Sequence, residues 1–408
     1  DTIVGKLFSG MKRDDVQLIQ TTSYVQFVQG FFVIIMGALL PYIRAEYGLN
    51  YAVSGALVSA ESVGKLIGSF IACYIAMGIG AKRSLALLNS VTYIGFAIML
   101  FTGNPIVLII AFVCMGFGRG TTLNYNSDTM NRLPGKDGLW MTYTQTFFAL
   151  GALIAPLLVS VCIDRAGFSW RLPDIIVVIL GAVAVLMVSR VKLSWYDDAL
   201  AAETKTEDKA QKNFGFLKSK VFWIVVAIGF CYCSFEASVM GWAATYFLDS
   251  GAIAENYVQV IVSWIWAGFL VGRVVCTGLV NRFRSDKLVL VLSLLTLAFY
   301  LVMLFCHSLA AIVLGVFGLG LGISGIYTLN IAGISHICRK YTAAMGFYMT
   351  ITLVGAIAIP SVVGGIAERF NISAGMKVLV VIAAIQLIMS VVNVMYRRKF
   401  KAGQDTIE

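Results

Sequence analysis

Twelve long apolar runs constrain the fold of this chain more than any other feature of its sequence. A helix needs about 20 apolar residues to cross the hydrocarbon core of a bilayer. Only helices and closed barrels satisfy their backbone polar groups in lipid, and these runs are too long for barrel strands. The sequence therefore predicts an all-α polytopic membrane protein with twelve transmembrane helices. The runs cover residues 19–43, 52–78, 84–102, 106–127, 139–163, 173–190, 220–248, 256–280, 287–306, 309–334, 342–368 and 373–396.

The composition excludes several other classes of protein. Only 13% of the residues are charged, against about 25% in soluble proteins. Soluble enzymes and disordered chains are therefore poor interpretations. The eight cysteines lie in or beside apolar runs, with no CxxC pair and no Cys/His cluster of metal-ligand spacing. We predict no disulfide framework, no metal site and no cofactor.

The distribution of Lys and Arg predicts the orientation of the chain in the membrane. Of 31 such residues, 23 lie on the side that holds both termini and the linker, and five lie on the opposite side. Cytoplasmic loops carry this excess of positive charge, so both termini are expected in the cytoplasm. The net charge of +10 follows from this topology and does not indicate nucleic-acid binding. A bacterial inner membrane is the expected location.

The sequence also indicates two similar halves. We predict six-helix bundles at 1–193 and 220–408, joined by a hydrophilic cytoplasmic linker at 194–219. An offset near 203 relates many residues, and both copies enter the membrane in the same direction, as parallel repeats do. Among the matches are Gly64 and Gly68 with Gly268 and Gly272, and Gly116, Gly118 and Gly120 with Gly318, Gly320 and Gly322.

Charged residues inside the runs are the first candidates for function, because a charge in the bilayer is costly and usually has a partner. Glu61 and Lys65 are spaced to pair along one helix face. Arg119 is expected to bind a substrate carboxylate or to neutralise an acid such as Glu61. Glu236 is the leading candidate for proton coupling, since a desolvated carboxylate holds its proton more tightly. The alternative for each is a purely structural pair or hydrogen bond.

Amide and aromatic side chains in the runs are candidates for binding the substrate. Neutral donors and acceptors beside aromatic faces suit a hydroxyl-rich solute, although tryptophan and tyrosine also fill interfacial belts. With Arg119, the predicted substrate-binding residues are Gln29, Asn124, Asn126, Gln145, Trp266, Tyr327 and Asn330.

Two stretches of sequence make the chain similar to known transporters. One runs from Gly116 to Pro156 and includes Gln145-Thr-Phe and Gly151-Ala. The other runs from Glu236 to Tyr246 and is followed by Trp266-Ala-Gly. On these residues and the twelve runs, the chain resembles the major facilitator superfamily, and more narrowly the fucose–galactose–glucose:proton symporter family. The resemblance implies alternating access by two rocking halves, with sugar bound between them and proton entry driving uptake.

The chain departs from that family where coupling acids are expected. The run at 19–43 contains no acid, and Thr121 stands where the family's helix 4 acid would fall. Our first hypothesis is a monomeric, proton-coupled secondary transporter of a small polar solute, most simply a sugar, with Glu61, Lys65 and Glu236 in coupling. A second hypothesis is an organic-anion carrier that uses Arg119 and Lys65. Drug or metabolite efflux and a non-transporting membrane sensor stay open as further alternatives.

Overall fold

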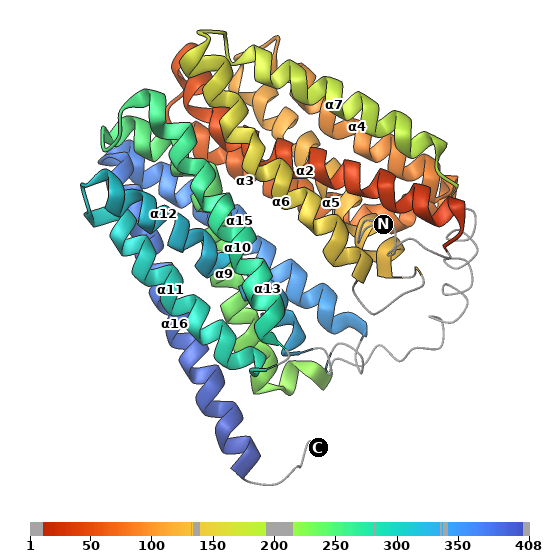
Figure 1. Cartoon of the computed structure of the whole chain (residues 1–408), viewed down its shortest axis with the longest axis vertical. Helices are drawn as coiled ribbons and strands as arrows, with labels where there is room; N and C mark the ends of the chain where they lie inside the picture. Colours follow the sequence, from red (N-terminus) through yellow and green to blue (C-terminus); the bar gives the residue numbers. More distant parts are fainter. Residues whose placement is uncertain are drawn as a thin grey trace, which may run out of the picture. The chain divides into compact units, whose positions relative to one another are not determined.

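The chain runs through long helices, as Figure 1 shows for this computed structural model. The structure describes residues 11–131, 133, 139–192, 215–280, 282–334, 337 and 342–402. Across that part of the chain twelve helices have 15 to 35 residues, which confirms the predicted all-α fold. These twelve are α2 (Arg13–Tyr47), α3 (Tyr51–Ile79), α4 (Ala81–Met99), α5 (Pro105–Asn131), α6 (Leu139–Val159), α7 (Arg171–Arg190), α9 (Lys220–Ser250), α10 (Val258–Val280), α11 (Ser285–Phe305), α12 (Leu309–Ile323), α15 (Thr342–Arg369) and α16 (Ile372–Ala402). A shorter helix of 7 residues, α13 (Ile326–Ala332), lies between α12 and α15.

Short non-α turns complete the architecture. A π-helical segment, η1 (Ser160–Arg165), continues from α6, and 3-10 turns η2 (Gly215–Lys218) and η3 (Glu255–Tyr257) precede α9 and α10. Helix α13 follows α12 after a turn at Ser324 and Gly325, so the two together form one predicted run. Most of the predicted linker lies outside the described residues.

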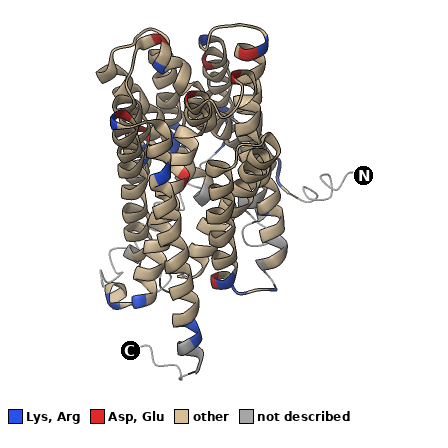
Figure 2. Ribbon diagram, turned by 90° about the vertical axis from the view of Figure 1, so that its left-hand side faces the viewer, with Lys and Arg blue, Asp and Glu red and all other residues tan. Residues whose placement is uncertain are grey.

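Ten helical stretches of the described chain are long and apolar enough to cross a membrane. Figure 2 shows charged residues mainly toward the helix ends, with long uncharged stretches between them. This is the distribution that a bilayer imposes, because charge is least costly at the interfaces.

Local sequence signals explain where several helices begin and end. The Ser219 hydroxyl accepts a bond from the Phe222 N–H at the start of α9, at 3.3 Å. Asn104 caps α5 in the same way through the Ile106 N–H at 3.0 Å, and Pro105 takes the first helical position. Gly48 and Gly251, with φ of 63° and 66°, end α2 and α9 in the left-handed conformation that glycine adopts at low cost.

The helices form two compact units, which we describe separately. Unit 1 comprises residues 1–35, 60–155 and 168–209, and unit 2 comprises residues 36–59, 156–167 and 210–408. In unit 1, α3 and α5 touch through their backbones: a Cβ built on Gly116 would overlap the carbonyl oxygen of Glu61, and one on Gly64 would overlap that of Val113. Small residues permit this approach in membrane helices.

Unit 2 repeats the same contact between α10 and α12. A Cβ on Gly320 would overlap the carbonyl oxygen of Ile265, and one on Gly268 would overlap that of Phe317. These pairs follow from the unit 1 pairs by an offset of 204. The expected match of Gly116 to Gly318 is therefore wrong by two residues, because glycines recur at every second position in both stretches and allow either alignment.

Adding a methyl group at Gly116 or Gly320 is expected to destabilise the protein by about 1–3 kcal/mol, because the helix backbones must move apart. The measurement is the apparent melting temperature of purified Gly116→Ala and Gly320→Ala. Gly365→Ala on α15 is the matched control, since nothing lies within 4 Å of its added Cβ; this variant should melt at or above the wild-type temperature. Equal melting temperatures for all three variants would contradict the packing described here.

Candidate functional site

An ion pair inside unit 1 joins α3 to α5. Arg119 Nη1 lies 2.8 Å from Glu61 Oε1, and the two side chains are 19% and 12% exposed. Lys65, half-buried, lies one turn after Glu61 on α3. Of the two interactions that the sequence suggested for Arg119, the structure therefore shows neutralisation of Glu61. The positive charge of Arg119 is largely compensated within the protein.

The repeat shows that this ion pair is not needed to pack the two helices. At the offset of 204, Glu61 corresponds to Ile265 on α10 and Arg119 to Ile323 on α12, and both isoleucines are fully buried. The same backbone contact thus forms around an apolar pair in unit 2. Burying an ion pair generally adds less stability than apolar residues of similar volume. We therefore expect the charges of Glu61 and Arg119 to have a function other than packing.

Buried polar side chains of α2, α4 and α5 form a hydrogen-bonded cluster in unit 1. Gln29 Nε2 donates to Asn89 Oδ1 at 3.3 Å, and the Thr122 hydroxyl lies 3.2 Å from the same oxygen. Gln29 was predicted to be a site residue, but Asn89 was not. A single amide in an otherwise apolar run gives no sequence signal for the direction in which it points.

Several polar atoms of this region have no hydrogen-bond partner among the described residues. They are Gln26 Nε2, Asn89 Nδ2 and both amide atoms of Asn126, and each side chain is at most 4% exposed. Asn126 also lines a cavity of about 20 Å³ with Thr22, Thr122 and Thr129, enough for about one water molecule. Because buried polar groups are nearly always satisfied, this region is built to receive water or a polar guest.

In unit 2, Glu236 on α9 is the centre of a second polar group. Tyr232, Glu236 and Arg273 on α10 lie close enough to one another to interact electrostatically. The rings of Tyr232 and Tyr327 lie 6.0 Å apart. Arg273 was not singled out from the sequence. Its pairing with an acid on another helix could not be read from spacing, since 37 residues separate the two.

The remaining predicted residues divide between the two units. Asn330 is buried in unit 2 and donates from Nδ2 to the Val225 carbonyl at 2.8 Å and to the Tyr348 hydroxyl at 3.1 Å. Trp266 is buried with its ring 5.2 Å from that of Phe269. Gln145 is half-buried on α6 in unit 1. The side chain of Asn124 lies outside the described residues.

Replacing Arg119 with alanine is expected to lower stability by about 3 kcal/mol, because Glu61 would then remain in the protein interior without its counter-charge. Glu61→Ile with Arg119→Ile copies the pair found in unit 2 and should melt within a few degrees of wild type. The apparent melting temperatures of the two purified variants make the comparison. A double variant that melts as low as Arg119→Ala would show that the charges are required for packing.

Comparison with known proteins agrees with this architecture. Residues 22–285 match the family model of the Major Facilitator Superfamily. The glucose/mannose transporter GlcP of Bacillus subtilis (strain 168) is 23% identical over 326 residues, which cover 77% of this chain and 79% of the relative. The TsgA homolog of Buchnera aphidicola subsp. Baizongia pistaciae (strain Bp) is 21% identical over 353 residues, covering 86% of this chain and 88% of the relative.

Solved structures share the fold at low sequence identity. The nucleoside transporter NupG superposes with a TM-score of 0.71 at 15% identity, covering 95% of this chain and 100% of the other. A D-xylose–proton symporter gives 0.71 at 14% identity, with coverage of 93% and 97%. The family match extends over more than half of the sequence. The chain therefore belongs to the Major Facilitator Superfamily, and it is a multi-pass membrane protein that acts as a secondary transporter of a small molecule and not as an enzyme.

Proposed function

We propose that this transporter moves a neutral, hydroxyl-rich solute, most simply a sugar, together with protons. The observation that carries the proposal is the 2.8 Å contact between Arg119 and Glu61. With the charge of Arg119 compensated, the binding chemistry proposed for unit 1 rests on the neutral amides of Gln26, Asn89 and Asn126 and on nearby hydroxyls. Such groups both donate and accept, as the hydroxyls of a sugar do.

The same contact argues against the organic-anion alternative. A carboxylate substrate is bound best by an arginine whose N–H fork is free to make two parallel hydrogen bonds. Arg119 Nη1 already faces Glu61, so an anionic substrate would bind an arginine whose charge is already offset, through Nε, which has no hydrogen-bond partner among the described residues. By contrast, Asn126 offers a donor and an acceptor without partners among the described residues, and it lines a small cavity with threonine, leucine and valine side chains.

Unit 2 contains its own group of predicted substrate-binding residues, which is largely aromatic. The Tyr327 ring lies 6.0 Å from that of Tyr232 and 6.2 Å from that of Tyr348, tilted against both. The carbonyl oxygen of the Asn330 side chain has no hydrogen-bond partner among the described residues. Together with Trp266, these groups offer apolar faces and an acceptor, which suit the two sides of a sugar ring. The glucose/mannose transporter among the relatives supports the same substrate class.

Two acids are the proposed sites of proton coupling. Glu236 interacts with Tyr232 and Arg273, and Glu61 pairs with Arg119 one turn before Lys65. In each case protonation of the acid would remove a negative charge from the surroundings of an arginine, so proton binding changes the electrostatic balance of the helix pair. The apolar residues at the positions equivalent to Glu61 and Arg119 support a functional reason for retaining the charges.

The proposal includes a topology for the working protein. We propose that residues 1–193 and 220–408 are the two six-helix halves, joined by a cytoplasmic linker at 194–219, and that both termini face the cytoplasm of a bacterial cell. The Lys and Arg distribution supports this orientation. Each chain contains both halves, so a monomer suffices to form the pathway.

Uptake by proteoliposomes tests the substrate class directly. A neutral sugar is expected to evoke an inward current that grows as the external pH falls, and small carboxylates should evoke none. Asn126→Ala should raise KM for that sugar about two- to tenfold, the loss expected for one neutral hydrogen bond. Currents evoked only by carboxylates, and abolished by Arg119→Ala, would establish the organic-anion alternative instead.

Glu236→Gln tests the coupling proposal in the same preparation. The amide keeps the shape of the side chain but binds no proton at neutral pH, so proton-driven accumulation should be lost while sugar exchange across the membrane continues. Glu255→Gln is the matched control, because Glu255 is exposed in η3; this variant should accumulate sugar normally. Normal accumulation by Glu236→Gln would mean that Glu236 has a structural role only.

A further inference from the structure

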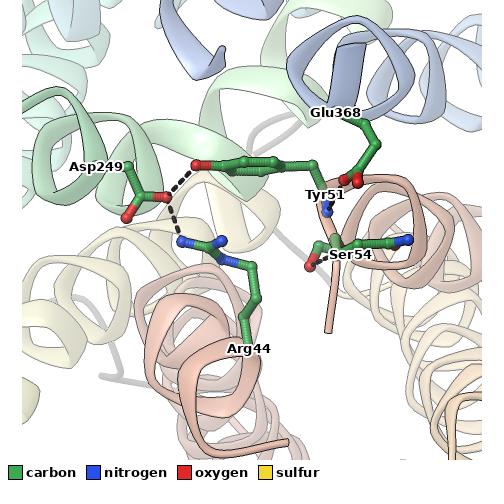
Figure 3. Close-up of polar contacts among 6 residues, drawn as sticks. Arg44, Tyr51, Ser54, Asp249 and Glu368 are labelled. Atoms are coloured by element: carbon green, nitrogen blue, oxygen red, sulfur yellow. Dashed lines mark hydrogen bonds and ion pairs between the residues drawn. The ribbon is translucent and has the colours of Figure 1, made fainter. Parts of the chain in front are cut away.

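A network of four side chains in unit 2 ties the end of α2 and the start of α3 to α9 and α15. We call Arg44, Tyr51, Asp249 and Glu368 the α2–α3 latch, and Figure 3 shows their arrangement. Residues 36–59, which carry Arg44 and Tyr51, group with residues 210–408 in this unit. Segments that are about 200 residues apart in the sequence thus meet at one helix end.

Asp249 is the shared acceptor of the latch. Its Oδ2 atom forms an ion pair with Arg44 Nη2 and accepts a hydrogen bond of 2.8 Å from the Tyr51 hydroxyl. Arg44 Cζ also lies 4.4 Å from the centre of the Tyr51 ring, a cation–π geometry. Each of the three side chains therefore contacts the other two, and removal of Asp249 would release both partners at once.

Glu368, in the last turn of α15, binds the first turn of α3. Its Oε2 atom accepts a hydrogen bond from the Tyr51 backbone N–H at 2.8 Å. A carboxylate at this place satisfies one of the free N–H groups at a helix start and interacts favourably with the helix dipole. The contact joins backbone to side chain, so it holds α3 itself rather than one flexible side chain.

Close packing continues behind the latch. The hydroxyls of Ser59 and Ser361 lie 2.7 Å apart, and Gln259 Nε2 donates to the Ala38 carbonyl at 3.0 Å. A Cβ on Gly37 would overlap the carbonyl oxygen of Met240. The latch is therefore more accessible to solvent than the packing behind it, since Arg44 and Asp249 are 19% and 23% exposed, whereas Ser59 is only 7% exposed.

We propose that the α2–α3 latch holds the substrate path shut at this end of the protein and that the transporter opens there by breaking it. The inference rests on the proposed function and on the alternating access that the family resemblance implies, in which the halves that contain α2–α3 and α9–α15 separate during each cycle. Partly exposed ion pairs and cation–π contacts each shift an equilibrium only a few-fold, and water can solvate the released groups. Such contacts favour the closed state over the open state by a small free energy, so the closed state can still open.

The test measures how fast a cysteine behind the latch reacts with a maleimide. Ser59→Cys, in the full chain in detergent, should react slowly while the latch is closed. Adding Asp249→Asn should raise that rate about tenfold, and Tyr51→Phe should raise it less because the aromatic ring remains. The rate is taken above that of the parent protein with its eight native cysteines. Ala252→Cys, exposed after α9, gives the rate of an open site.

Two further variants separate a latch from general loosening of the fold. Exchanging the charges, with Arg44→Asp and Asp249→Arg, should return the reaction to the slow rate. Asp286→Asn removes an ion pair with Arg284, 2.9 Å long, elsewhere in the same unit and should leave the rate unchanged.

An unchanged rate in Asp249→Asn would overturn the latch, as would equal acceleration by Asp286→Asn. The readout needs no substrate, so a protein that transports no sugar can still confirm or refute the latch.

Discussion

The cost of leaving a charge without a counter-charge in the membrane organises the polar interior of this transporter. In unit 1 the cost is offset by a single contact, Arg119 to Glu61, between helices that touch through their backbones at Gly116. The equivalent helix pair in unit 2 avoids the cost altogether with Ile265 and Ile323. The comparison between repeats separates what the fold requires from what the site adds to it.

The pairing of Arg119 with Glu61 also affects which class of substrate the surrounding groups favour. Most of the nearby polar atoms that lack partners among the described residues belong to amides, on Gln26, Asn89 and Asn126, and the others are the Tyr93 hydroxyl and Arg119 Nε. Amides offer directional hydrogen bonds without net charge, which favours a solute rich in hydroxyls. In unit 2 the acid Glu236 interacts electrostatically with Tyr232 and Arg273. Each unit therefore contains both an acid that can bind a proton and neutral groups that can bind a solute.

Sequence reasoning predicted the features that depend on long patterns. The twelve helices follow from apolar runs that can form nothing else in lipid, and the repeat follows from an ordered series of glycines. Its register between Gly116 and Gly320 could not be read, because alternate glycines match equally well two residues away. Features that depend on direction were missed, since Asn89 and Arg273 give no sequence sign of which helix they face. The latch was missed because Arg44, Asp249 and Glu368 look like ordinary charges at helix ends.

Stabilisation of the purified protein by candidate solutes tests the central claim most directly, because it reports binding without any assumption about coupling or direction. The panel should pair neutral sugars with carboxylates of similar size, and the readout is the melting temperature at saturating solute. Our account predicts that a neutral sugar raises the melting temperature of wild type and that the rise is lost in Gln29→Ala. A rise produced only by carboxylates, and lost in Arg119→Ala, would contradict it.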